Sequence, residues 1–296
     1  MSRARRRRAK RNARANRPPS EPRLDLHLHS TASDGRYPPL EVLHTCASRG
    51  LRTIALTDHD VPPALPAGEH TVGDRTIRLI HAAEVSALHE GTELHLLAYF
   101  PGEMPQEFVD FLRHRAQRRA ERYNAAAHAL GLPPAPPEAQ AGERALTRHH
   151  LARALVEHKH CGSIHSAFMG PLARGKGVVP SIELGVADAL AKMNACGAVA
   201  VWAHPRVDHA AEHTATFATL GLHGLEAIRP SASLTQRAAL ARIALEHGLV
   251  VTGGSDWHGW GGRLGSFRVR ATEIAPFLAR LDGPEPAAQD SVSPIG

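Results

Sequence analysis

The sequence predicts an α/β fold built on a parallel sheet or a barrel, and two observations indicate it. Short runs of β-branched and other apolar residues, each typical of a strand, recur at residues 23–29, 52–57, 77–82, 93–100, 198–203, 222–228 and 249–252. Helical periodicity fills many of the intervals, most clearly at residues 39–49, 182–195 and 233–247. Strands separated by helices favour a parallel arrangement, because each helix returns the chain to the same edge of the sheet.

The first strand illustrates the expected organisation. Leu26 and Leu28 alternate with His27 and His29, and residues two apart in a strand share a face. We therefore expect the leucines to face covering helices and the two imidazoles to point together to the opposite side.

The interval between the fourth and fifth strands, residues 101–180, contains no convincing strand. Apolar residues at helical spacing predict an amphipathic helix near its start: Phe108, Phe111 and Leu112. The proline-rich residues 133–137 break this pattern, and a second helix is expected at about residues 147–158. We expect a helical insertion that lies over the sheet.

The positive charge of the chain is concentrated at its start. The net charge is +6, but residues 1–22 hold nine Arg or Lys against one Glu, which leaves 26 basic and 28 acidic side chains in the rest. Such a segment is expected to be disordered, either as a solvated extension or misplaced start, or as an arm that binds RNA or an anionic surface. The expected organisation is a basic tail at 1–22, barrel segments at 23–100 and 181–283, an insertion at 101–180, and a flexible end at 284–296.

Composition excludes several other classes of protein. A chain of 296 residues with 43% hydrophobic residues can bury a large core, which excludes generic disorder. Its three cysteines are far apart and form no C-x-x-C pair, which indicates a reducing compartment. No apolar run approaches the roughly 18 to 20 residues that span a bilayer, and no apolar signal segment follows the arginines. We therefore expect a cytoplasmic protein with no membrane contact.

Histidine is the most unusual component. The chain has 21 histidines, all of them after residue 22, which is roughly three times the ordinary usage. Imidazole serves metal binding and proton transfer near neutral pH, so this excess indicates metal or proton chemistry.

Side chains that can bind metals follow or occupy almost every expected strand. They are His27, His29, Asp34, His59, Glu84, His95, His204, Asp256 and His258. In an α/β barrel the C-terminal strand ends meet on one face, so six strands would supply one site. Six histidines and three carboxylates are too many for one four-coordinate ion, whereas two or three ions bridged by shared carboxylates fit them better. Three divalent ions with one bridging hydroxide would leave about +2, a suitable field for a phosphate dianion.

Other polar residues have simpler interpretations. A single histidine is more often a packed or surface residue than a ligand, and this covers His44, His70, His81, His89, His209 and His223. Asp58 and Asp60 are expected to cap a helix or to orient His59, rather than to bind metal directly.

These motifs, taken in order, resemble the PHP superfamily, named for polymerase and histidinol phosphatase. The matching pieces are Asp25-Leu26-His27-Leu28-His29, Ser33-Asp34-Gly35, Thr57-Asp58-His59-Asp60, Glu84, His95, Ala203-His204-Pro205 and Gly254-Ser255-Asp256-Trp257-His258. The resemblance implies a distorted (β/α)7 barrel and three metal ions. It implies one ion on His27, His29, Glu84 and Asp256, a second on Glu84, His95 and His204, and a third on Asp34, His59 and His258.

Within this superfamily the chain is most similar to nucleoside 3′,5′-bisphosphate phosphatases, which are also described as 5′-3′ exoribonucleases of short RNA. The insertion and two segments, residues 147–153 and 172–177, carry this likeness. The resemblance implies that Arg148 and His150 face the substrate phosphate. Residues 228–232 and the basic arm fall outside the pattern.

The expected reaction is phosphomonoester hydrolysis by attack of a metal-bound hydroxide on phosphorus. Asp34, His59 and His258, with the third ion, would bind the phosphate and the leaving oxygen. Arg148 would clamp the phosphate, and His150 would position it or protonate the leaving group, unless it is a neutral surface residue. Arg174 and Lys176 are further candidates for substrate contact, or part of a solvated loop.

Three questions remain open from the residues. The family resemblance implies Mn²⁺, and Fe²⁺ or Zn²⁺ are also compatible with imidazole and carboxylate ligands. The few aromatic residues that could stack on a nucleoside are Tyr99, Trp257 and Trp260. The alternative functions are a phosphatase of histidinol phosphate or another small phosphomonoester, and an RNA-binding protein that uses the basic tail.

Overall fold

The computed structural model of the chain describes residues 23–173 and 175–283. The basic arm, Arg174 and residues 284–296 lie outside this range, so the expectations for them stay predictions.

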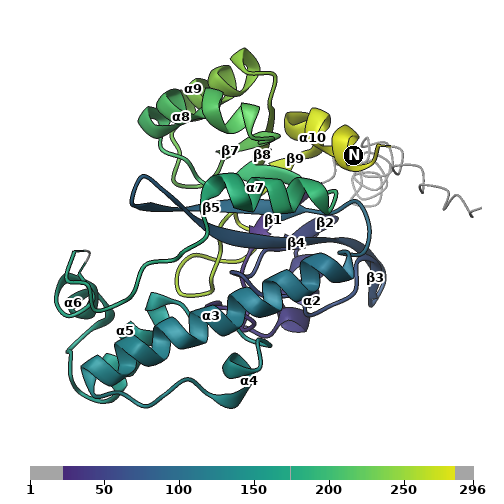
Figure 1. Ribbon diagram of the computed structural model, residues 1–296. Coiled ribbons are helices and arrows are strands. Elements are labelled where there is room, and N and C mark those ends of the chain that lie inside the picture. Colours follow the sequence, from purple (N-terminus) through teal and green to yellow (C-terminus); the bar gives the residue numbers. More distant parts are fainter. Residues whose placement is uncertain (1–22, 174, 284–296) are drawn as a thin grey trace, which may run out of the picture.

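The described strands form one mixed sheet (Figure 1). Hydrogen-bonded neighbours follow the order β8-β7-β6-β5-β4-β2-β1-β9, and β3 pairs with β4 at the side. The strands are β1 Arg23–Leu28, β2 Thr53–Leu56, β3 Gly68–Val72, β4 Arg75–His89, β5 Thr92–Tyr99, β6 Val199–Trp202, β7 Gly224–Ile228, β8 Val250–Gly253 and β9 Val269–Arg270. All seven expected strands are present.

The two ends of the sheet approach each other beyond β8. The backbone N–H of Asp256 donates to the carbonyl of His27 at 2.9 Å, and the N–H of His29 donates to the carbonyl of Trp257 at 3.0 Å. Gly254 permits this contact, because a Cβ atom there would lie 2.3 Å from the Cβ of His27. The sheet is a nearly closed, distorted barrel, as the resemblance implies.

The strand directions differ from the expected parallel arrangement. β4 pairs antiparallel with β5, and β5 pairs antiparallel with β6. The reason is the two-residue turn Glu90-Gly91, since a connection this short can form a hairpin but cannot carry the chain back to the same edge. β4 also continues well beyond residue 82, where the predicted strand ends. The prediction stops too early because Glu84 and Ser86 interrupt the apolar pattern, although both are buried in the strand.

Helices cover both sides of the sheet. α7, α8 and α9 lie on one side in Figure 1 and α3 on the other; α4 and α5 contact α3, and α6 contacts α5 at the left of the view. The bounds are α2 Pro39–Ser48, α3 Gln106–Leu130, α4 Pro137–Gln140, α5 Arg148–Glu157, α6 Ile164–Met169, α7 Val186–Ala195, α8 Val207–Thr219, α9 Leu234–Glu246, the 3-10 helix Ala271–Ile274 and α10 Ala275–Leu281. The pattern predicts α2, α3, α5, α7 and α9, but it misses α4, α6, α8 and α10, and it starts α7 four residues too early.

The helical segment between β5 and β6 is anchored to the barrel by α3. Phe108 and Leu112 of α3 are buried in one hydrophobic cluster with Phe100 and residues of β4 and β5. α3 ends at Gly131, whose φ of 64° is the left-handed geometry of a helix C-cap. In the described chain this segment contains no strand, in agreement with the sequence. The division into separate domains at residues 101 and 180 stays a prediction.

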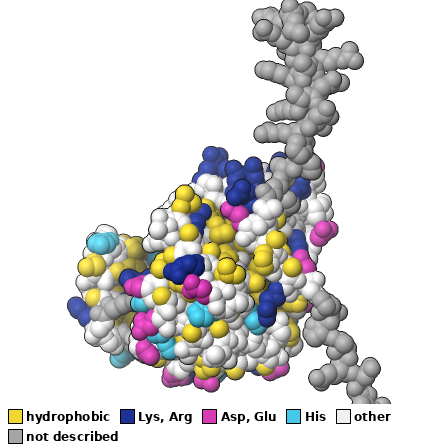
Figure 2. All heavy atoms as spheres, turned by 90° about the horizontal axis from the view of Figure 1, so that it is seen from above, with side chains coloured by type: hydrophobic (Ala, Val, Ile, Leu, Met, Phe, Trp, Pro, Cys, Tyr) yellow, Lys and Arg dark blue, Asp and Glu magenta, His cyan; other side chains and the backbone are white. Residues whose placement is uncertain are grey.

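None of the described helices has both the length and the apolarity to cross a bilayer. Seen from above α8, α9 and α10, the surface carries basic, acidic and hydrophobic side chains interspersed with one another (Figure 2).

Candidate metal centre

The nine predicted ligands form one continuous cluster inside the barrel. β1, β4 and β5 supply His27, Glu84 and His95, and the segments after β1, β2, β6 and β8 supply His29, Asp34, His59, His204, Asp256 and His258. Glu84 is fully buried and lies at the centre of this cluster. The strand topology therefore places side chains that are far apart in sequence around one carboxylate.

The first group of the cluster surrounds Oε2 of Glu84 and Oδ1 of Asp256. His27 Nε2 lies 3.2 Å from the Glu84 oxygen and 3.4 Å from the Asp256 oxygen, and the corresponding distances for His29 Nε2 are 3.1 and 3.3 Å. Ligand atoms on one tetrahedral ion with bonds of about 2.0 to 2.2 Å lie about 3.3 to 3.6 Å apart. The four side chains thus have nearly the spacing of a single coordination sphere.

The second group uses the other oxygen of the same carboxylate. His95 Nδ1 lies 2.9 Å and His204 Nε2 lies 3.1 Å from Oε1 of Glu84. Glu84 can therefore bridge two ions through its two oxygens, which is the arrangement expected of a shared carboxylate.

The third group surrounds Asp34. His258 Nε2 lies 3.2 Å from Oδ1 and His59 Nε2 lies 3.9 Å from Oδ2 of this carboxylate. His258 Nδ1 is 2.9 Å from the backbone carbonyl of Asp256, to which it can donate, so Nε2 is the nitrogen left to bind an ion. His59 also places Nδ1 3.2 Å from Oε2 of Glu84, so its ring lies between two groups.

Unsatisfied nitrogen atoms support metal binding by this cluster. Among the described residues, His29 Nε2, His59 Nδ1 and His95 Nδ1 are buried and have no hydrogen-bond partner, although each lies within 3.2 Å of a Glu84 oxygen. Leaving a buried polar atom unpaired is costly, and a cation between nitrogen and carboxylate removes that cost. The imidazole and carboxylate donors fit Mn²⁺, Fe²⁺ or Zn²⁺.

The electrostatics of the cluster also favour cations. Burial alone would lower the pKa of His29, but Asp256 and Glu84 raise it to about 10. Burial alone would raise the pKa of Glu84, but His59 and His27 hold it well below its usual range. For His59 burial prevails and lowers the pKa to about 3, so this ring is neutral at pH 7. Ionised carboxylates thus stabilise positive charge here, which an ion can supply in place of protons.

Sequence reasoning missed Glu226 on β7, which holds two of the predicted ligands. Its carboxylate lies 3.0 Å from His27 Nδ1 and accepts the backbone N–H of His204 at 2.8 Å. A carboxylate on the outer nitrogen of an imidazole fixes the ring orientation and the tautomer that can bind metal. A single acidic residue within the buried apolar strand 224–228 was the signal that could have identified it.

Asp58 differs from the expectation that it orients His59. Its two oxygens accept the backbone N–H and the hydroxyl of both Ser30 and Ser33, at 2.6 to 3.1 Å. Asp58 therefore fixes the loop after β1, which carries Asp34.

Asp60 also binds elsewhere than at His59. Its carboxylate accepts from the Arg119 guanidinium of α3 at 2.7 Å and from the backbone N–H of Ser86 at 3.1 Å. These contacts join α3 to the loop that carries His59 and to β4.

Three residues around the cluster have left-handed backbone conformations. The φ angles are 45° at Asp60, 35° at His204 and 54° at Asp256. Such angles are uncommon for residues other than glycine and cost about 1 to 3 kcal/mol each. The strain is concentrated at positions that support or contribute the predicted ligands.

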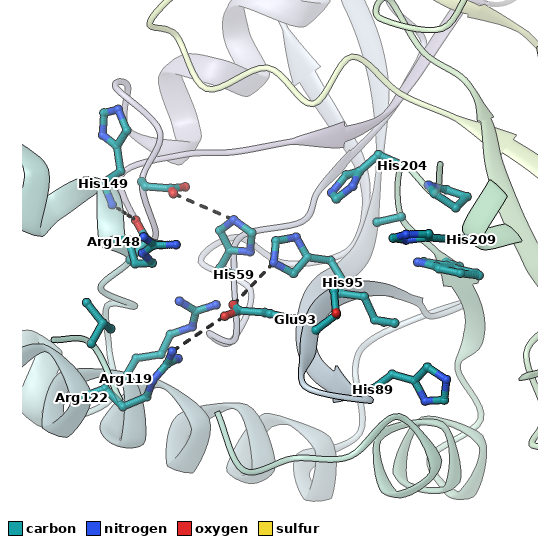
Figure 3. A pocket seen from close by; sticks show the side chains of 18 of the residues that line it. His59, His89, Glu93, His95, Arg119, Arg122, Arg148, His149, His204 and His209 are labelled. Atoms are coloured by element: carbon teal, nitrogen blue, oxygen red, sulfur yellow. Dashed lines mark hydrogen bonds and ion pairs between the residues drawn. The ribbon is translucent and has the colours of Figure 1, made fainter. Parts of the chain in front are cut away.

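The cluster opens into a cavity of about 670 Å³ (Figure 3). Arg148 and His149 of α5 line one side of it, with Arg119 and Arg122 of α3 below them in this view. Arg148 donates to the carbonyl of Leu172, which holds the guanidinium against this wall. The cavity is therefore lined both by residues of the candidate metal cluster and by cationic side chains, and this environment suits an anionic substrate.

The structure places the other expected substrate contacts differently. His150 is part of the α5 cap, because its Nδ1 accepts the backbone N–H of Thr147 at 3.0 Å, and its neighbour His149 lines the cavity instead. Lys176 is exposed and outside the lining of this cavity, and Arg174 lies outside the described residues.

The candidate stacking residues also differ from one another. Tyr99 is fully buried and its hydroxyl donates to a backbone carbonyl at 2.8 Å, so it belongs to the core. Trp257 is half-buried and packs against another aromatic ring. Trp260 is 43% exposed, stacks on His149 with 5.7 Å between ring centroids, and donates to the carbonyl of Asp34 at 3.0 Å. Trp260 thus lies next to the cavity and the third group.

Comparison with known proteins agrees with this site. The PHP domain model matches residues 25–174. The chain is 32% identical over 247 residues to the 5′-3′ exoribonuclease Rnm of Salmonella typhimurium, covering 79% of this chain and 84% of that protein. It is 31% identical to the 3′,5′-nucleoside bisphosphate phosphatase of Chromobacterium violaceum, covering 87% and 94%. It is 30% identical to a phosphoribosyl 1,2-cyclic phosphate 1,2-diphosphodiesterase of Eggerthella lenta, covering 83% and 99%.

A solved structure supports the fold independently. A metal-dependent phosphoesterase structure from Bifidobacterium adolescentis superposes with a TM-score of 0.71 at 23% identity, covering 89% of this chain and 98% of that one. Sequence match, fold and ligand cluster agree: the chain belongs to the PHP domain family and is a metal-dependent phosphoesterase.

Proposed function

We propose that this protein removes the 3′-phosphate of nucleoside 3′,5′-bisphosphates, and that it also degrades short 5′-phosphorylated RNA in the 5′-3′ direction. The observation that carries the proposal is the nine-residue cluster around Glu84 and Asp34, which opens into a cavity with Arg148 on its wall. Two relatives with these activities in their names span most of the chain.

The cluster is suited to hold three divalent ions, for which Mn²⁺ is the proposed metal. Such ions activate water at neutral pH and neutralise the oxygens of a phosphoryl group. The chain itself fixes their positions: Glu226 and Asp58 hold the ligands and their loops, as their hydrogen bonds indicate.

Three groups of side chains in or next to the cavity would bind the substrate. Arg148 presents a guanidinium that can pair with phosphate oxygens in two parallel hydrogen bonds. Asp34, His59 and His258 lie on the side where the reacting phosphate and its leaving oxygen would sit. Trp260, stacked on His149 and partly exposed, offers a surface for a nucleobase.

The free state of all three cysteines also accords with a cytoplasmic location, where nucleotide substrates occur.

Comparing substrates in one assay tests the proposal. Release of inorganic phosphate is measured for adenosine 3′,5′-bisphosphate, adenosine 5′-monophosphate and histidinol phosphate, and release of nucleoside 5′-monophosphates is measured for a short 5′-phosphorylated RNA. We expect the highest kcat/KM with the bisphosphate. Faster release from histidinol phosphate would overturn the substrate assignment and leave the metal mechanism intact.

A variant pair separates the metal mechanism from the substrate assignment. His59→Ala is expected to abolish release from every substrate, whereas His44→Ala, an exposed position on α2, is expected to behave as the parent chain. Full activity of His59→Ala, with an unchanged circular dichroism spectrum for both variants, would contradict the mechanism.

A further inference from the structure

A second group of metal-competent side chains lines the same cavity, away from the cluster around Glu84. His89 ends β4, Glu90 follows it in the hairpin turn, and His213 projects from α8. One nitrogen or oxygen atom from each of these three side chains lies within 4.8 Å of the other two. In Figure 3, His89 and the nearby His209 of α8 lie on the side of the cavity opposite to Arg148 and His149.

The distances fit a shared ion. His89 Nε2 lies 3.4 Å from His213 Nδ1 and 3.9 Å from the Glu90 carboxylate. Two nitrogens on a tetrahedral Zn²⁺, with bonds of about 2.0 to 2.1 Å, lie about 3.4 Å apart. The Glu90 carboxylate would need to move by about half an ångström to lie at this spacing from His89 Nε2, and its side chain is 74% exposed.

The two imidazoles are held in position by the core. Phe217, one helical turn beyond His213, is fully buried. The His89 ring packs edge-on against it with 4.9 Å between centroids, and the His213 ring stacks on it at 5.9 Å. The rings are therefore oriented toward each other before any ligand binds, which reduces the entropy lost on binding.

The Glu212 carboxylate lies near the outer nitrogen of His213. Its distance from His213 Nε2 is 3.6 Å, within ion-pair distance but longer than a hydrogen bond, and His213 Nδ1 faces His89. His209 is one turn earlier on the same face of α8, and its ring centroid is 6.4 Å from that of His213.

We propose that His89, Glu90 and His213 form an additional Zn²⁺ site at the edge of the catalytic cavity. Two imidazoles and one carboxylate are a ligand set that Zn²⁺ accepts with one position open. The open position would face the cavity that all three residues line, where it can bind an anionic oxygen. An alternative is a hydrogen-bonded histidine pair packed on Phe217, and the experiment distinguishes the two.

Equilibrium dialysis of the metal-stripped full-length chain against Zn²⁺, followed by elemental analysis, gives the number of ions per chain. We expect His89→Ala and His213→Ala each to hold one Zn²⁺ fewer than the parent chain. His44→Ala, which removes an exposed helical histidine, is expected to hold the parent number. All four chains share the ligands around Glu84, so the difference does not depend on how many ions that cluster binds or on its substrate.

A second variant covers the case in which loss of a ring against Phe217 disturbs folding. Glu90→Gln changes an exposed side chain and keeps its shape, so it should fold and bind the additional Zn²⁺ about 10-fold or more weakly. The proposal is overturned if His89→Ala, His213→Ala and Glu90→Gln, each with the parent circular dichroism spectrum, bind Zn²⁺ with the parent number and affinity.

Discussion

Single residues determine the geometry of the candidate metal centre. Glu84 presents one oxygen to His27 and His29 and the other to His95 and His204. A shorter side chain, or one with a single ligand atom, could not reach both pairs of histidines from this position on β4. The bridging role of this carboxylate therefore depends on its reach as much as on its charge.

Glu226→Gln tests how far the supporting carboxylate matters. Gln keeps the size of the side chain but weakens the interaction with His27 Nδ1, which the carboxylate holds at 3.0 Å. We expect metal affinity at the cluster to fall about 10- to 100-fold. Isothermal titration with Mn²⁺ measures this, with Glu246→Gln on the exposed surface of α9 as the control. Unchanged affinity in Glu226→Gln would show that the ring needs no such support.

His150 gives a pH-dependent contribution to stability. Burial, with the Arg144 guanidinium as a further cause, lowers its pKa from 6.5 to about 4. The unfolded chain therefore binds a proton more readily between these values, so the stabilisation is complete above about pH 6.5 and is lost as pH falls to about 4.

Replacing His150 with Gln tests this contribution, because Gln can accept the same capping hydrogen bond and cannot titrate. Between pH 7 and 4, the free energy of unfolding of the parent should fall on the order of 2 kcal/mol more than that of His150→Gln. Urea denaturation across this range measures the difference, and parallel curves would contradict the shifted pKa.

Helix α3 holds the loop after β2 in position through a buried ion pair. Arg119 of α3 donates to Asp60 at 2.7 Å and to the hydroxyl of Ser86 at 2.6 Å, and all three side chains are buried. Burial would raise the pKa of Asp60, but Arg119 and Arg115 lower it, so the carboxylate is ionised. The position of the His59 loop thus depends on a helix from the insertion.

Removal of the Arg119 charge is expected to destabilise the protein strongly. Arg119→Met leaves Asp60 paired only with the guanidinium of Arg115. Breaking a buried ion pair by removing one partner lowers the free energy of unfolding by about 3 to 5 kcal/mol. Arg113→Met, on the exposed face of the same helix, should change stability by less than about 0.5 kcal/mol. Urea denaturation compares the two, and equal effects would show that the buried pair contributes nothing specific.

For the whole molecule, sequence periodicity and motifs predicted the barrel and the nine clustered side chains. The clustering was predictable because each of these side chains follows or lies in a strand, and strand ends converge. The predicted strand directions and strand length were wrong where tertiary contacts override the local pattern. β4 and β5 form a long antiparallel hairpin in which β4 carries the polar residues Glu84 and Ser86. The additional site was also missed, since His89 and His213 are 124 residues apart and meet only through packing on Phe217.

The basic arm, residues 1–22, is separate in sequence from the residues of the cluster. None of the nine clustered residues lies within residues 1–22, which carry the chain's excess of positive charge. Deleting these residues should leave kcat/KM for adenosine 3′,5′-bisphosphate unchanged, as measured by phosphate release at physiological ionic strength. A large loss would assign the arm a part in binding small substrates.

We expect the cluster around Glu84 to act as a metal centre that hydrolyses phosphate esters. The most direct measurement is phosphate release from adenosine 3′,5′-bisphosphate by the metal-stripped chain, before and after Mn²⁺ is returned, for the parent and Glu84→Gln. We predict that stripping abolishes release, that Mn²⁺ restores it in the parent, and that Glu84→Gln stays at least about 100-fold slower. Full activity without metal, or full recovery of Glu84→Gln, would contradict the account.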